Sequence, residues 1–176
     1  MSGEPKQFPG TRTVLYSTKL RSATHFVVGV SHGLGMVVCK RYEVMNADFF
    51  SRFIREELPG VLQRSGKPRV LLQDNDPSQT SRASREALTS IGATHFEIPA
   101  RSPDLNPIEN LFHLTKSSLR EEAVALVLRS ESVAAFEERV VRTLGNMARA
   151  HADKTIESMG KRIAEVIRRG GGRSSY

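Results

Sequence analysis

The chain has 176 residues, of which 39% are hydrophobic and 26% charged, and this balance is that of one folded domain rather than of a disordered chain. Lys and Arg outnumber Asp and Glu by 26 to 19, and the resulting net charge of +7 favours a polyanionic partner, nucleic acid first. A single cysteine, Cys39, excludes an internal disulfide and a thiolate zinc site. We find no apolar run of about 18 residues and no signal peptide, which predicts an intracellular protein without a membrane partner.

The first elements in chain order form a predicted hairpin and helix. "THFVVGV" (24–30) and "GMVVCKRY" (35–42) alternate as strands do, and the turn-like "SHGLG" joins them. Asn46 is placed to cap a helix through "ADFFSRFIREEL", whose apolar residues share one side. Upstream of the hairpin, "TRTVLYS" (11–17) is a further candidate strand.

The next elements alternate strand and helix. "RVLLQ" (69–73) predicts a buried strand, "SRASREALTSIG" (81–92) a helix, and "THFEIP" (94–99) a strand that Pro99 ends. The remainder predicts helices. Strands that alternate with helices indicate a mixed sheet with helices packed on it. Functional groups gather just beyond the carboxyl ends of strands in such sheets, and Asp74 lies one residue past such an end.

Acidic residues occur in two polar stretches, "QDNDPSQTS" (73–81) and "RSPDLNPIEN" (101–110). Carboxylates that converge from different elements hold Mg²⁺, so Asp74 and Glu109 are candidate metal ligands. A purely structural interpretation stays open for each. The first stretch is equally typical of a turn. Glu109 is equally suited to be the third residue of a helix that Asn106 caps, a position from which its side chain can reach the backbone N–H of the cap residue.

The two stretches together, with 34 residues between Asp74 and Glu109, resemble the DDE transposases of the Tc/mariner superfamily. The resemblance continues in "GVSHGLGMVVCKRYEVMNADFF" and in the closing "IESMGKRIAEVIRRGGGRSSY". It implies an α/β fold, a ribonuclease H-like mixed sheet flanked by helices, over residues 11–169, with a lead-in at 1–10 and a flexible tail at 170–176. It also implies that Asp74 and Glu109 bind Mg²⁺ or Mn²⁺.

The chain departs from the family pattern at several positions. The family's first strand carries a third catalytic aspartate, and no Asp precedes Asp48 here, which falls in a predicted helix. That strand lies centrally in the family's sheet, so we expect either "TRTVLYS" (11–17) to fill its place or the sheet to be open there. The family's DNA-reading helix-turn-helix domain is also missing, Gln79 replaces a common His, and Val28 and Phe112 replace tryptophans.

The resemblance implies metal-dependent cleavage and transfer of DNA strands in cut-and-paste transposition. With one acid missing, we expect an incomplete copy that is inactive alone. The alternative is an inactive remnant that binds DNA or a protein partner through its basic surface. The expected partner is DNA, with no small-molecule substrate, and self-association stays open. A eukaryotic source would place the protein in the nucleus. The residues expected to contact phosphates are Arg162, Arg168, Arg169 and Arg173.

Overall fold

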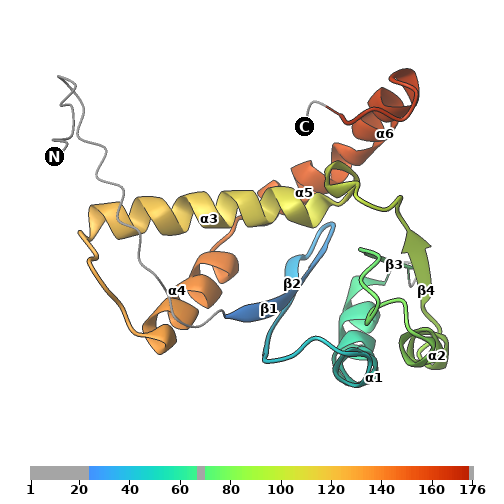
Figure 1. The fold of residues 1–176 in the computed structure, drawn as a ribbon, viewed down its shortest axis with the longest axis horizontal. Coiled ribbons are helices and arrows are strands. Elements are labelled where there is room, and N and C mark those ends of the chain that lie inside the picture. Colours follow the sequence, from blue (N-terminus) through green and yellow to red (C-terminus); the bar gives the residue numbers. More distant parts are fainter. Residues whose placement is uncertain (1–23, 67–69, 175–176) are drawn as a thin grey trace, which may run out of the picture.

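The computed structural model describes residues 24–66 and 70–174, so the predicted lead-in and the candidate strand at 11–17 lie outside the described residues. Helices and strands follow one another nearly as expected from the sequence (Figure 1). Their order and bounds are β1 (His25–Ser31), β2 (Gly35–Tyr42), α1 (Ala47–Ser65), β3 (Val70–Gln73), α2 (Arg82–Ser90), β4 (Thr94–Glu97), η1 (Pro103–Leu105, a 3₁₀ turn), α3 (Pro107–Ala125), α4 (Val133–Gly145), α5 (Arg149–Glu157) and α6 (Met159–Arg168).

The predicted hairpin is confirmed. Strands β1 and β2 pair antiparallel, with a bulge between Gly29 and Val30. The turn between them requires glycine, because Gly33 and Gly35 have φ angles of 83° and 74°. The other two strands, β3 and β4, pair in parallel. Helix α2 connects them, as expected for a strand–helix–strand unit.

The mixed sheet that we expected is open in the described part of the chain. The described residues contain two separate two-stranded sheets, β1–β2 and β3–β4. The two sheets are separate because no described strand pairs with both of them, so each sheet keeps edges without a backbone partner among these residues. Burial raises the pKa of Tyr42, the last residue of β2, and the carboxylates of Asp76 and Asp74 beyond β3 raise that pKa further.

Helix α1 joins the two sheets through the main core. Its N-cap is Asn46, as predicted, whose side chain accepts a hydrogen bond from the Phe49 amide at 2.8 Å. The helix continues past the predicted end at Leu58 and through Pro59, because Leu58 and Val61 are both buried and their packing outweighs the hydrogen bond that a proline removes. The buried core residues are Val38, Phe50, Phe53, Ile54, Leu58, Val61, Ala87, Leu88 and Ala93.

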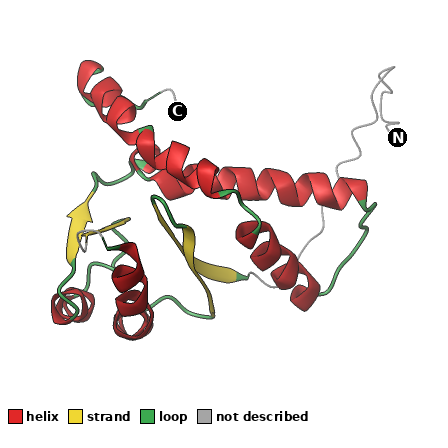
Figure 2. Ribbon diagram, turned by 180° about the vertical axis from the view of Figure 1, so that it is seen from behind, coloured by secondary structure: helices red, strands yellow, loops and turns green. Residues whose placement is uncertain are grey.

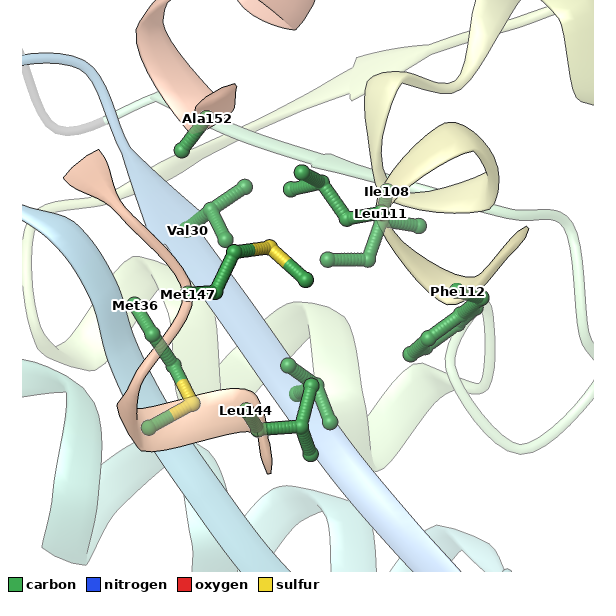
Figure 3. A pocket seen from close by; sticks show the side chains of 9 residues that line it. Val30, Met36, Ile108, Leu111, Phe112, Leu144, Met147 and Ala152 are labelled. Atoms are coloured by element: carbon green, nitrogen blue, oxygen red, sulfur yellow. The ribbon is translucent and has the colours of Figure 1, made fainter. Parts of the chain in front are cut away.

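The C-terminal helices cover the hairpin. Helix α3 is long and runs past the hairpin, α4 lies beside it, and α5 leads into α6, which projects from the end opposite α4 (Figures 1 and 2). A cavity of about 10 Å³ remains between β1, β2 and the helices (Figure 3). Its lining includes Val28 and Phe112, and it is apolar and no larger than one water, so it is a packing gap rather than a ligand pocket. None of the helices described is long and apolar enough to cross a membrane.

Candidate metal site

The first acidic segment follows β3 directly. Gln73, the last residue of the strand, is buried, whereas Asp74 is exposed. The Asp74 carboxylate accepts one hydrogen bond, from the Asp76 amide at 3.3 Å, which is the geometry of an Asx turn. The predicted turn is therefore present, but a single long hydrogen bond leaves most of the oxygen lone pairs of Asp74 available.

The neighbouring Asp76 is used differently. Its Oδ1 accepts from the Ser78 amide at 2.8 Å and also from the Ser78 hydroxyl, so this carboxylate closes the turn. Two further hydrogen bonds fix the segment. Asn75 Nδ2 donates to the Ile98 carbonyl at 2.8 Å, and the buried Ser84 hydroxyl donates to the Ser78 carbonyl at 2.7 Å. The turn is thus tied both to the residue after β4 and to helix α2.

The second acidic segment contains η1 and the first turn of α3. Asn106 caps α3 and Pro107 occupies the first helical position, as predicted, with the cap side chain accepting from the Ile108 amide at 3.3 Å. The reciprocal half of the capping interpretation is wrong. The Asn106 amide donates to the Pro103 carbonyl at 3.1 Å, so it is not left for the Glu109 carboxylate. Glu109 is exposed, and its carboxylate has no hydrogen-bond or ion-pair partner among the described residues.

Asp104, the other acid of this segment, is engaged. Its Oδ2 accepts from the Ser174 amide at 2.8 Å, and this hydrogen bond is the main cause that holds the pKa of Asp104 below its usual value. Of the acids in the two segments, Asp76 and Asp104 are therefore occupied by the protein's own donors. Asp74 and Glu109 are the ones left available.

A family comparison establishes what class of protein carries these two segments. The family model of the DDE superfamily endonucleases matches residues 4–127, more than half of the chain, and the match includes both acidic segments. The chain belongs to the DDE superfamily endonucleases. The sequence resemblance to Tc/mariner transposases is thereby confirmed at the level of the family.

Two curated relatives are Tc/mariner-type transposases from nematodes. The chain is 29% identical to the Tcb2 transposase of Caenorhabditis briggsae over 112 residues, which are 60% of this chain and 40% of that protein. It is 43% identical to the Tc1 transposase of Caenorhabditis elegans over 54 residues, 31% of this chain and 20% of that protein. The chain therefore matches less than half of the length of either relative.

Solved structures confirm the fold class. The crystal structure of the catalytic domain of Mos1 mariner transposase superposes with a TM-score of 0.70 at 20% identity, covering 86% of this chain and 76% of that one. A pre-cleavage Mos1 transpososome gives a TM-score of 0.76 at 17% identity, covering 99% of this chain and 53% of that one. At these identities the likeness establishes a ribonuclease H-like fold.

The carboxylates of this DDE domain suit a hard cation. Mg²⁺ takes one or two carboxylates and completes its shell with water and phosphate oxygens, and two exposed, available carboxylates supply that donor set. Within residues 24–66 and 70–174, no group of three or more His, Cys, Asp and Glu side chains is arranged to hold a metal. A shared site of Asp74 and Glu109 thus stays a prediction.

The predicted phosphate-contacting arginines separate into two kinds. The Arg168 side chain is 71% exposed and that of Arg169 41%, and Arg173 is also exposed. Glu165 offsets part of this charge, because it contacts Arg169 at 2.7 Å and Arg168 at 3.9 Å. Arg162, in contrast, is only 1% exposed, so its side chain is out of reach of DNA. Arg162 must be removed from the predicted set.

Sequence reasoning missed the structural position of Arg162. A signal was present, because Arg162 follows Met159 by three residues and precedes Val166 by four, which places it on the apolar side of α6. A charged residue at such a position is buried only where the fold supplies acceptors for it.

Proposed function

We propose that this chain is the catalytic domain of a Tc/mariner-type DDE transposase, which cleaves and transfers DNA strands with Mg²⁺ or Mn²⁺ held by Asp74 and Glu109. The observation that supports this proposal best is that only two of the four acids in the two segments are held by strong hydrogen bonds to the protein. Asp76 and Asp104 accept strong hydrogen bonds from backbone amides at 2.8 Å each, whereas the two acids that match the family motifs are exposed and available.

The chain's own residues would prepare this site. Asp74 is presented at the end of β3 by a turn that Asn75 and Ser84 fix, and Glu109 is presented in the first turn of α3. A divalent ion bound there would polarise a phosphate oxygen and lower the pKa of a bound water or hydroxyl. Support for the metal comes from Mos1, whose catalytic domain has been solved with Mg and with Mn.

We propose DNA as the partner. Mos1 has been solved in a paired-end complex with the left transposon end, and this chain carries a net charge of +7. We assign phosphate contacts to Arg168, Arg169 and Arg173, and nuclear localisation if the source is a eukaryote. Self-association of the domain on DNA belongs to the same proposal.

We expect the chain not to cleave DNA by itself. The sequence has no Asp before Asp48, and Asp48 lies in the first turn of α1, where it follows the N-cap. Two-ion catalysis requires an acid that bridges both ions, so the chain with Asp74 and Glu109 alone should not cleave DNA at a useful rate.

A nicking assay on supercoiled plasmid with Mg²⁺ or Mn²⁺ tests the proposal. We expect no nicking by the chain alone, and nicking once an upstream strand that carries an aspartate is fused to it. Asp74→Asn and Glu109→Gln should each abolish the activity of the fusion, whereas Asp48→Asn, a control that removes an exposed carboxylate outside both segments, should retain it. Nicking that survives both ligand substitutions would overturn the site, and a fusion that never nicks would overturn the activity.

Binding to a fluorescent DNA duplex tests the partner separately. Affinity should be weak, insensitive to base sequence and steeply dependent on salt, because phosphate contacts release counterions. Arg168→Gln should reduce the salt slope by about one, as loss of one phosphate contact does. Affinity that stays constant as salt rises, or a strong preference for one short sequence, would contradict this part of the proposal.

A further inference from the structure

Arg162 of helix α6 is the largest side chain that is fully buried in the described part of the chain, at 1% exposure. Burying a guanidinium is costly unless its N–H groups find acceptors. Three hydrogen bonds provide these acceptors. Nε donates to the Ser158 hydroxyl at 2.9 Å, and Nη1 donates to the Asp104 carbonyl at 3.1 Å and to Asn110 Oδ1 at 3.2 Å. None of these three acceptors is a carboxylate.

The acceptors lie on both sides of Glu109. Asp104 belongs to η1, which precedes the first turn of α3, and Asn110 is the residue directly after Glu109. One nitrogen atom, Nη1 of Arg162, therefore connects the two parts of the segment that presents this acid. These contacts are long-range, because Arg162 is 58 residues from Asp104 and 52 from Asn110.

The chain after α6 adds a second connection to the same segment. The Ser174 amide donates to the Asp104 carboxylate at 2.8 Å, 70 residues away in the sequence. Helix α6 contacts η1, in the loop that leads into α3 (Figure 1). The C-terminal region thus contacts Asp104 of η1 twice, with Arg162 bonded to its carbonyl and Ser174 bonded to its carboxylate.

We propose that Arg162 is a positioning residue for Glu109, through which helix α6 controls the affinity of the metal site. This inference rests on the proposed role of Glu109 as a metal ligand. A ligand side chain must be kept within about 0.5 Å of its working position, and a proline-rich loop without long-range contacts does not supply that precision. Removing the guanidinium leaves the Asp104 carbonyl and the Asn110 side chain without their shared donor, so the first turn of α3 loses its link to α6.

The test compares Arg162→Met, Arg162→Lys and Lys161→Met. The last variant removes the exposed, positively charged neighbour of Arg162 in the same helix and serves as the matched control. Metal-free hydrogen exchange of the amides at 105–111 is the first measurement, and Mn²⁺ affinity is the second. Arg162→Met should speed exchange at 105–111 but not in α1. It should weaken Mn²⁺ binding by less than the about 10- to 100-fold loss that follows removal of a ligand's direct hydrogen-bond partner, because Arg162 bonds the neighbours of Glu109.

Arg162→Lys should restore part of both properties, since an ammonium still reaches one or two of the acceptors. It also keeps the test decisive if Arg162→Met does not fold. Unchanged exchange at 105–111 in Arg162→Lys and in folded Arg162→Met would overturn the proposal, as would equal effects of Lys161→Met. If wild-type protein binds no Mn²⁺, the metal site itself is refuted, and the exchange measurement alone decides whether Arg162 orders the Glu109 segment.

Discussion

The two acidic segments are fixed by contacts of different range. The segment around Asp74 depends on short-range bonds, from Gln73 to Gln79 and from Ser84 to Ser78, and on one from Asn75 to Ile98, 23 residues away. The segment around Glu109 depends on Arg162 and Ser174, which are 52 to 70 residues from their partners. Asp74 should therefore tolerate changes in the C-terminal helices, whereas Glu109 should respond to them.

The largest expected effects come from the buried leucines beneath each segment. Leu111→Ala in α3 and Leu88→Ala in α2 should each lower the free energy of unfolding by about 2–5 kcal/mol, because each leaves a cavity. Their local effects should differ. Hydrogen exchange should increase first at 105–111 for Leu111→Ala and first at 74–84 for Leu88→Ala. Leu114→Ala, a control at a 40% exposed position in α3, should change stability by less than about 0.5 kcal/mol.

A smaller effect is expected from Ser84→Ala in the Asp74 segment. Ser84 is fully buried and its hydroxyl donates to the Ser78 carbonyl at 2.7 Å, so the substitution leaves that carbonyl without this donor. We expect a loss of about 1–3 kcal/mol in chemical denaturation. Exchange should rise at 74–80 and stay unchanged at 105–111. Equal changes in both segments would show that they are not independent. Ser90→Ala, at an exposed position of the same helix, is the control.

The corresponding change in the Glu109 segment is loss of the N-cap of α3. Asn106→Ala should cost about 0.5–2 kcal/mol, because the Ile108 amide loses its side-chain acceptor. Asn106→Ser should restore most of that stability, since serine caps as well as asparagine does. Thermal unfolding of wild type, Asn106→Ser and Asn106→Ala should show stability decreasing in that order. A serine variant as unstable as the alanine variant would show that the cap does not explain the loss.

The smallest expected effect is the acid dependence of the contact between η1 and the C-terminal end. The folded-state pKa of Asp104 is depressed, chiefly by the Ser174 amide. The contact therefore contributes stability above the unfolded-state pKa, and that contribution is lost as pH falls through the folded pKa. Asp104→Asn should remove this part of the acid dependence of unfolding below about pH 4. If the stability of Asp104→Asn depended on pH in the same way as that of wild type, the contact would not contribute as described.

The sequence allowed prediction of most elements because their signals are local. The Gly33 and Gly35 turn, the Asn46 cap and the Asn106–Pro107 start of α3 are each specified by neighbouring residues. The end of α1 was predicted too early because Pro59 is a local signal for termination, whereas burial of Val61 is a tertiary effect. Local patterns also do not reveal how strands from different parts of the chain combine, which is why the division into two sheets was not settled.

Sequence identified the acids of the site but not what supports them. The motifs pointed to Asp74 and Glu109, and the turn predicted for the first stretch is present and closed by Asp76. It placed Arg162 on the DNA-facing surface because a charge near the end of a basic chain is usually exposed. The burial of Arg162 depends on acceptors more than 50 residues away, Asp104 and Asn110, and no single stretch of sequence contains that information.

A double-mutant cycle on Mn²⁺ affinity determines whether Asp74 and Glu109 bind one shared cation. Asp74→Asn, Glu109→Gln and the double variant would be titrated with Mn²⁺ and compared with Asp48→Asn, which removes an exposed carboxylate outside both segments. We expect each single substitution to remove most of the affinity, the double variant to lose little more, and the Asp48 variant to bind as wild type does. Losses that simply add, or single variants that bind as wild type does, would contradict a shared site.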